Sequence, residues 1–533
     1  MLKKLHGRKL AVCLLGGAMY ALFSAFGWQA EHGGIIWAGG ALLVAALLVW
    51  PIAALLAVLL ERGYTRALRQ EKPFRGGRAF AFMLACYVPM FCVVFPGSFA
   101  YDVPYQLRQV VTGAYSTHHP LLHTLALGGL LQLGRALGDI NLGAALYTVL
   151  QMALLAGCFA LTCGSIARQS GARAAKRAAV FFALYPLNMV MAVNVTKDVL
   201  FGGFFALTLA LLNEMQERPS RGLTLKIAVC GALAVMLRNN MAYAALVWLA
   251  LLTIGLRKGE KSAALAVLLA LAVGLCGNAA LKRATRAESG DMSEMLSWPI
   301  QQLARARLYD EERLTDAEKE AIDELMPGEA WACYDPTISD PVKFEFDTQT
   351  FRADVKKYVG VWLSVGKKCA GTYLDATMAL TYPFFYPYRE YRVSGYYVQM
   401  GMSDAYDASW CDFDPPESRS LFPRALASLS WRFGAKGAMQ IPVVGWLFNM
   451  GVIVWTMLFF ALREMYWGRW RRFGTALLPV LLWGTFLLGP VMAGRYIYPF
   501  VCALPVLAAR PGRSVKEAAR GARRNDEGWR GAV

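Results

Sequence analysis

The chain of 533 residues is strongly apolar: 56% of its residues are hydrophobic, 17% are charged and the mean hydropathy is +0.37. Soluble domains carry about 25% charged residues, so these values exclude an ordinary soluble protein and predict an all-α polytopic membrane protein. The formal net charge of +18 falls largely on predicted cytoplasmic loops, so no nucleic-acid partner is expected. Eleven cysteines show neither CxxC pairs nor His/Cys ligand spacing, which argues against a zinc or redox site.

The apolar runs, taken in chain order, predict about twelve transmembrane helices. No clear small-x-small cleavage site precedes Glu31, which favours a retained first span over a signal peptide. A run of about 17 to 25 apolar residues crosses a bilayer, and some of these runs are shorter. The predicted spans are 10–28, 35–60, 79–96, 141–164, 178–193, 199–213, 223–237, 241–256, 262–281, 437–461, 474–491 and 496–509.

The placement of basic residues gives the chain an orientation. With the N-terminus inside, the connections that become cytoplasmic hold 31 of the 55 Lys and Arg residues, whereas the short connections on the other face hold five. Basic residues concentrate on cytoplasmic loops, so both termini are predicted to be cytoplasmic. The segment 282–436 holds the other 19 and is predicted to be an extracytoplasmic insert, partly folded as a cap.

This topology divides the chain into five parts. They are an N-terminal pair of spans with a basic loop (1–74), a transmembrane core (75–281), the cap (282–436), the C-terminal spans (437–509) and a basic tail (510–533). In the outer loop 96–140 of the core, the segment 121–138 is apolar enough to be mistaken for a span. The basic loop 165–177 requires an odd number of crossings before it, and 141–164 supplies one. Helices are therefore predicted along the outer interface at about 104–113 and 121–138.

The predicted outer face gathers the polar residues that could perform chemistry. Such residues in or beside spans are costly and tend to mark function. The stretch YDVPYQLRQVVTGAYSTHHPLLH (101–123) holds an aspartate and three of the chain's five histidines, and NVTKDVLF, LRNNMAY and GRYIYPF follow at later outer turns. We expect these motifs to converge beneath the cap. The residues concerned are Asp102, His118, His119, Lys197, Asp198, Arg238, Asn239, Arg495 and Tyr496.

Such a set suits a substrate with a phosphate leaving group and a nearby proton to remove. Arg binds phosphate in a bidentate manner and Lys supplies a point charge. A carboxylate serves as a general base, or shares a divalent cation such as Mg²⁺ or Mn²⁺ with the phosphate. Asp102 and Asp198 are thus the catalytic candidates, and Asp102 is also the candidate metal ligand. The candidate substrate- or phosphate-binding residues are Lys197, Arg238, Asn239, Arg495, Tyr496, His118 and His119.

Each candidate also has a purely structural interpretation. Asp102 could cap the helix that begins near Pro104, because Asp before Pro is a common helix entry. Lys197 and Asp198 could form an internal ion pair, and the two arginines could extend to lipid headgroups. The histidines could form a metal site, but Pro120 interrupts the helix that would align them, which favours substrate contacts or a role in loop architecture.

The order of these motifs resembles the GT-C superfamily of membrane glycosyltransferases, which use lipid-phosphate-linked sugars. Protein O-mannosyltransferases and the aminoarabinose transferases of lipid A are examples. The similar parts are a loop Asp, interfacial helices introduced by His-His-Pro-Leu, a second acid in the next outer turn, and Arg-Tyr-x-x-Pro near the last span. Stretches such as FPGSFAYDVPYQL, YSTHHPLLHTL, SWPIQQLAR and TYLDATMALTYPFFYP are more closely similar to an uncharacterised, mainly Gram-positive bacterial family of multispan proteins.

The resemblance implies a GT-C-like core in a bacterial plasma membrane. The implied activity is that of a hexosyl- or pentosyltransferase, which moves a sugar from a polyprenyl-phosphate carrier to an acceptor outside the cytoplasm. The loop acid falls on Asp102, as base or metal ligand, and the second acid falls on Asp198. Better-known members often have paired acids in the first loop, whereas here Val103 follows Asp102.

Three alternatives stay open. A polysaccharide polymerase or ligase, or a lipid-modifying enzyme, would use the same arginine-rich outer pocket for a diphosphate lipid. A transporter would place polar, broken helices at the bilayer midplane and show repeated halves, neither of which this sequence indicates. A receptor or scaffold without catalytic activity would keep the same fold.

Overall fold

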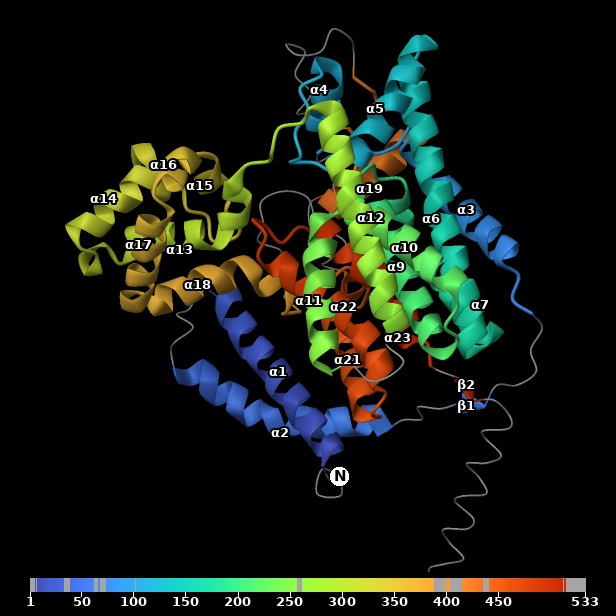
Figure 1. The fold of residues 1–533 in the computed structure, drawn as a ribbon, viewed down its shortest axis with the longest axis horizontal. Coiled ribbons are helices and arrows are strands. Elements are labelled where there is room, and N and C mark those ends of the chain that lie inside the picture. The colour runs from blue at the N-terminus through green and yellow to red at the C-terminus, as the bar shows by residue number, and fades with distance from the viewer. Residues whose placement is uncertain are drawn as a thin grey trace, which may run out of the picture.

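The computed structural model describes residues 5, 7–32, 39–61, 66–67, 73–100, 102–255, 261–387, 398, 400–402, 415–434, 441–510 and 512–513. The regular elements of this part of the chain are helices, apart from two short strands, β1 (Arg66–Ala67) and β2 (Gly512–Arg513), which pair in parallel. Most of the helices stand side by side in one bundle (Figure 1). The predicted all-α fold is confirmed.

Within the described residues, six helices are long and apolar enough to cross a membrane. They are α1 (Arg8–Glu31), α2 (Gly39–Glu61), α3 (Gly76–Val93), α6 (Ile140–Ser170), α9 (Lys197–Glu217) and α12 (Lys261–Thr285). The other predicted runs also form helices, but these are shorter or less apolar. They are α7 (Ala172–Leu184) with α8 (Pro186–Ala192), α10 (Arg221–Leu237), α11 (Asn239–Gly255), α21 (Met450–Tyr466), α22 (Trp470–Leu487) and α23 (Tyr498–Ala508).

Two of the predicted runs differ from the helices that form. The run at 178–193 is divided into α7 and α8 by Pro186, because proline lacks an N–H group and disfavours the helical conformation of the residue before it. The run at 437–461 becomes the helix α21 only from its middle. There Asn449 caps the helix, and its side chain accepts a hydrogen bond of 3.0 Å from the backbone N–H of Val452. Local capping and proline thus set boundaries that hydropathy alone places wrongly.

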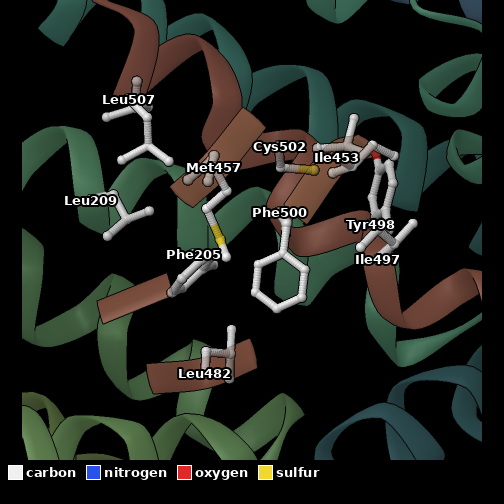
Figure 2. Packing of buried hydrophobic residues seen from close by; sticks show 14 of the residues in the cluster. Phe205, Leu209, Ile453, Met457, Leu482, Ile497, Tyr498, Phe500, Cys502 and Leu507 are labelled. Atoms are coloured by element: carbon white, nitrogen blue, oxygen red, sulfur yellow. The ribbon is translucent and has the colours of Figure 1, made fainter. Parts of the chain in front are cut away.

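Helix α9 is the central helix of the bundle, and 89% of the residues in its most apolar 18-residue stretch are buried. It packs against α6, α10, α22 and α23. Figure 2 shows its Phe205 among Met457 of α21, Leu482 of α22 and Phe500 of α23, all buried in one core. Because α9 begins at Lys197, this packing fixes the position of the charged residues in its first turn.

Helices α4 (Val103–Thr112) and α5 (Leu121–Ala136) form at the two segments where interfacial helices were predicted. They lie at the upper end of the bundle in Figure 1. The backbones of α5 and α6 approach each other very closely. A Cβ atom at Gly134 would lie 2.3 Å from the backbone nitrogen of Gly143, and one at Gly143 would lie 2.2 Å from the carbonyl oxygen of Leu130. Small residues at helix contacts permit such an approach.

The close approach of α5 and α6 predicts that a larger residue at Gly143 destabilises the protein. Gly143→Ala is expected to lower the thermal unfolding temperature of the detergent-purified protein, because the new methyl group must push α5 and α6 apart, and overpacking costs about 1–3 kcal/mol. Gly129→Ala, also on α5, is the matched control, since a Cβ atom there meets nothing within 4 Å. Tryptophan fluorescence during heating measures both variants. Equal unfolding temperatures for the two would contradict the close packing.

The part of the insert from η2 to α18 forms a helical module with its own core beside the bundle (Figure 1). The predicted boundary at 282 falls inside α12, which continues to Thr285. The described elements of the insert are η2 (Met292–Leu296), α13 (Ser297–Tyr309), η3 (Glu311–Arg313), α14 (Asp316–Leu325), η4 (Pro327–Cys333), α15 (Asp340–Phe344), α16 (Thr348–Ala353), α17 (Val355–Lys368), α18 (Ala370–Thr381), η5 (Tyr382–Phe384) and α19 (Pro423–Gly434). Contacts of α18 with α1 join the module to the bundle. Helix α19 lies at the upper end of the bundle in Figure 1 and packs against α3. The short turns η7 (Val444–Leu447) and η8 (Gly494–Ile497) precede α21 and α23.

Candidate functional site

The loop that carries Asp102 is held against the segment that leads into α9. The backbone N–H of Val195 donates to the carbonyl oxygen of Ser98 at 2.9 Å. From α6, the buried side chain of Gln151 donates to the carbonyl oxygen of Asn194 at 3.0 Å. These bonds bring the loop that carries Asp102 next to the first turn of α9, although the two are distant in the sequence.

Asp102 is engaged by cations from two other elements. Its Oδ2 accepts a hydrogen bond from Lys197 Nζ at 2.7 Å, and its Oδ1 accepts one from Arg495 Nη2 at 3.1 Å. Although Asp102 directly precedes α4, its side chain makes no capping hydrogen bond to that helix. Asp102 occupies the N-cap position of α4, but the interpretation that its side chain caps the helix is wrong. Its carboxylate instead ties the loop that carries it to α9 and η8.

Asp198 forms the buried half of the same cluster. Its Oδ1 lies 2.5 Å from Arg238 Nε, and its Oδ2 lies 3.8 Å from Arg495 Nε. The hydroxyl of Thr196 also donates to Oδ2, at 3.2 Å. Arg495 thus touches both carboxylates and joins them into one cluster, which we call the ion network. Its members are Asp102, Lys197, Asp198, Arg238 and Arg495.

The ion network contains three cations and two carboxylates, so it has one net positive charge. Burial by itself would raise the pKa of Asp102, but the charges of Arg495 and Lys197 outweigh burial and hold that pKa well below its usual range. The carboxylate is therefore ionised at neutral pH. While these ion pairs persist it is also a weak base, because basicity falls with pKa.

Aromatic rings position the two arginines. The guanidinium of Arg238 lies 4.6 Å from the ring centre of Phe486 and 4.5 Å from that of Tyr496. The guanidinium of Arg495 lies 5.3 Å from the same tyrosine ring. Such cation–π contacts fix the planes of both guanidinium groups. Sequence reasoning included Tyr496 but missed Phe486, because an aromatic residue at the end of an apolar helix carries no distinguishing signal.

The three histidines have three different environments. His119 is buried, with Nδ1 3.7 Å from Asp102 Oδ2, and burial lowers the pKa of His119 to about 3, so it is neutral at physiological pH. His118 is exposed, and its ring meets that of His119 edge-on at 4.6 Å. His123 is turned toward Gln106, with its Nδ1 3.0 Å from the side-chain oxygen. Only His119 therefore borders the ion network.

Asn239 takes no part in the ion network among the described residues. It is exposed at the first residue of α11. The side chain of the next residue, Asn240, donates to the hydroxyl of Thr485 at 3.2 Å and so ties α11 to α22. The structure thus joins five of the predicted site residues and sets His119 and Tyr496 beside them. It leaves Asn239 and His118 outside.

The described residues do not fit the predicted Mg²⁺ or Mn²⁺ site. Within the described part of the chain, no group of three or more His, Cys, Asp or Glu side chains is arranged to hold a metal ion. Hard divalent cations are bound by several oxygen ligands. Both oxygens of Asp102 instead face cationic side chains of the protein.

The insert is tied to two of the loops that carry the site, the loop around Asp102 and His119 and the loop before η8. Each tie is a hydrogen bond with a backbone N–H donor, and it involves a residue close in sequence to a member or neighbour of the ion network. The hydrogen bonds run from Thr117 N to Glu288 O (2.8 Å), from Ser339 N to Pro490 O (2.8 Å) and from Gly401 N to Ser98 Oγ (3.0 Å). The beginning, middle and end of the insert thus brace the segments next to His119, Arg495 and Asp102.

The cavity found between α3, α6, α9 and α10 lies at the opposite end of these helices. It has a volume of about 730 Å³, and its walls are mostly apolar, with Arg168 and Lys226 among the lining residues. None of the predicted site residues lines it. The cavity is therefore separate from the ion network.

The model of a family of unknown function, DUF6020, matches residues 110–525. The chain belongs to this family. The matched region includes Lys197, Asp198, Arg238 and Arg495 of the ion network, whereas Asp102 precedes it. No curated protein and no solved structure matches the chain.

Proposed function

We propose that this DUF6020 member is a membrane glycosyltransferase. It would transfer a sugar from a polyprenyl-phosphate carrier to an extracytoplasmic acceptor, such as a cell-wall glycan, a glycolipid or a protein. The observation that supports this proposal is the ion network, in which three cations outnumber two carboxylates at one end of the helical bundle. A phosphate leaving group needs cations, and an acceptor hydroxyl needs a base. The network offers both within a few ångströms.

The proposed reaction uses Asp102 and the two cations that contact it, Lys197 and Arg495. Lys197 and Arg495 hold the phosphate of the carrier, and the acceptor oxygen attacks the anomeric carbon of the sugar. The bond from that carbon to the phosphate oxygen breaks, and the polyprenyl phosphate leaves with the electron pair. The hydroxyl proton passes to the carboxylate of Asp102. As negative charge grows on the leaving phosphate, the fixed cations stabilise it more strongly than they stabilise the ground state.

The membrane arrangement that accompanies this proposal has about twelve spans and a GT-C-like core. Helices form at all the predicted runs, and the first turn of α9, the end of α10 and the start of α23 meet at one end of the bundle. Helices α4 and α5 lie at that end, and the start of α1 lies at the other (Figure 1). In a bacterial plasma membrane, both termini would then be cytoplasmic and the ion network would face outward.

A lipid diphosphate is the second donor to consider, because three clustered cations also suit a diphosphate. A polysaccharide polymerase or ligase would use such a donor. Incubating the purified protein in lipid with radiolabelled sugar on a polyprenyl monophosphate or diphosphate distinguishes the two. We expect consumption of the monophosphate-linked sugar, and consumption of the diphosphate alone would replace the proposal by the second function.

The Asp102→Asn variant tests the proposed base. The amide keeps the shape of the carboxylate but cannot accept the hydroxyl proton, so sugar transfer should fall by about 10²- to 10⁴-fold. Transfer of labelled sugar is measured alongside the elution profile and the unfolding temperature, which should show a folded protein. A folded Asp102→Asn protein with wild-type activity would contradict the proposed mechanism.

A further inference from the structure

The carboxylate of Asp102 occupies the position that the proposed function assigns to the carrier's phosphate. Its two oxygens lie 2.7 Å from Lys197 Nζ and 3.1 Å from Arg495 Nη2. Phosphate oxygens accept the same charge-assisted hydrogen bonds from Lys and Arg. A bound phosphate and the carboxylate would therefore compete for the same two cations.

The ion network has an exchangeable half and a fixed half. Asp102 is its most exposed member, with 20% of its side chain accessible, and Lys197 beside it is 13% accessible. Asp198 is 0% accessible and keeps Arg238 at 2.5 Å. Arg495 also lies 3.8 Å from Asp198, so it retains a carboxylate neighbour if it loses Asp102. An incoming anion can thus replace Asp102 without dismantling the rest of the network.

The charges favour such an exchange. The five described members of the network together carry one net positive charge, and a phosphodiester anion carries one negative charge. The carboxylate that leaves the cations loses the ion pairs that make it a weak base. Binding of the donor would then be coupled to the appearance of a competent base, so part of the binding energy would be used to activate the catalytic group.

We propose that Asp102 is an internal competitor for the phosphate subsite, and that the phosphate of the lipid carrier binds by displacing the Asp102 carboxylate from Lys197 and Arg495. The identity of that phosphate rests on the proposed function. The competition itself rests on the shared cations and on the difference in accessibility between Asp102 and Asp198. Because of this competition, the Asp102 carboxylate becomes an effective base only when the donor is bound.

The test is the affinity of a short-chain polyprenyl monophosphate that carries no sugar, measured by calorimetry on the purified full-length protein. Asp102→Asn should bind this lipid at least about tenfold more tightly than the wild type, because the competing charge is gone. Asp102→Glu keeps the charge and should show no such gain. Lys197→Gln should bind the lipid at least about tenfold more weakly than the wild type.

Asp139→Asn is the matched control, because Asp139 also pairs with an arginine, Arg419, but lies outside the ion network. It should bind like the wild type. Equal or weaker binding by a folded Asp102→Asn protein would overturn the competition, and Asp102→Ser serves the same test if the asparagine variant does not fold. Absence of monophosphate binding by every variant would also overturn it.

A parallel transfer assay separates this inference from the proposed function. A gain in affinity for Asp102→Asn, together with a wild-type protein that transfers no sugar from either donor, would support the competition and reject the transferase activity. Sugar transfer by the wild type without any gain in affinity would reject only the competition.

Discussion

Arg238→Gln is expected to lower the free energy of unfolding by about 3–5 kcal/mol, the usual cost of removing one partner of a buried ion pair. Asp198 is fully buried, and Arg238 Nε at 2.5 Å is its nearest cation. The next cation, Arg495, lies 3.8 Å away and is shared with Asp102. The substitution therefore leaves the buried carboxylate with the Thr196 hydroxyl and with one cation, Arg495, which is more distant and is shared with Asp102. Tryptophan fluorescence during heating of the detergent-purified protein measures the loss.

The matched control removes an arginine from an exposed ion pair. Arg419 lies 2.7 Å from Asp139, but their side chains are 52% and 41% accessible, and exposed pairs contribute little to stability. Arg419→Gln should therefore unfold close to the wild-type temperature. The double variant Asp198→Asn with Arg238→Gln should recover part of the loss, because it removes both buried charges. Equal unfolding temperatures for Arg238→Gln and Arg419→Gln would contradict the structural role of the buried pair.

Arg495→Gln is expected to reduce sugar transfer by about 10²- to 10³-fold, the usual effect of losing one preorganised group that stabilises developing negative charge. Arg495 is the only member of the described ion network that touches both carboxylates. In the proposed reaction it also holds the leaving phosphate. Arg495→Lys should fall between the wild type and Arg495→Gln, because lysine keeps the charge but lacks the planar fork that reaches two partners. Initial rates with labelled donor measure the effect.

The control for Arg495 is Arg108→Gln. Arg108 is exposed on α4, close in sequence to Asp102, yet it lies outside the ion network. Its loss changes the net charge of the chain by the same amount but should leave the transfer rate near that of the wild type. A folded Arg495→Gln protein whose transfer rate stays within about fivefold of the wild-type rate would show that Arg495 does not hold the leaving group, because a fivefold change is less than about 1.4 kcal/mol of activation free energy.

Much of the framework follows from simple sequence patterns. Apolar runs located helices that the structure contains, since an apolar helix of membrane length has few alternatives to burial in lipid or in a bundle. The alternation of basic and non-basic connections placed the first outer loop, NVTKDVLF, LRNNMAY and GRYIYPF at the same end of successive antiparallel helices. That parity accounts for Asp102, Asp198, Arg238 and Arg495 lying at one end of the bundle, but not for the contacts between them.

Boundaries and partners required the three-dimensional arrangement. The pattern before Pro104 also allowed a helix cap, but the side chain of Asp102 contacts Lys197 and Arg495 instead. His118 and His119 are adjacent in sequence, yet one is exposed and the other is buried beside Asp102. No periodicity in the sequence distinguishes these outcomes.

What the sequence by itself determined is the class of the molecule, its helical runs and the side of the bundle on which its charged loops lie, because hydropathy and loop charge act over whole segments. What only the tertiary structure decided is which carboxylate is partly exposed to solvent and which is fully buried. Asp102 is partly exposed on two shared cations, whereas Asp198 is enclosed with Arg238. Ion pairs and burial depend on contacts of a few ångströms between segments far apart in the chain, and only the packing around α9 sets those distances.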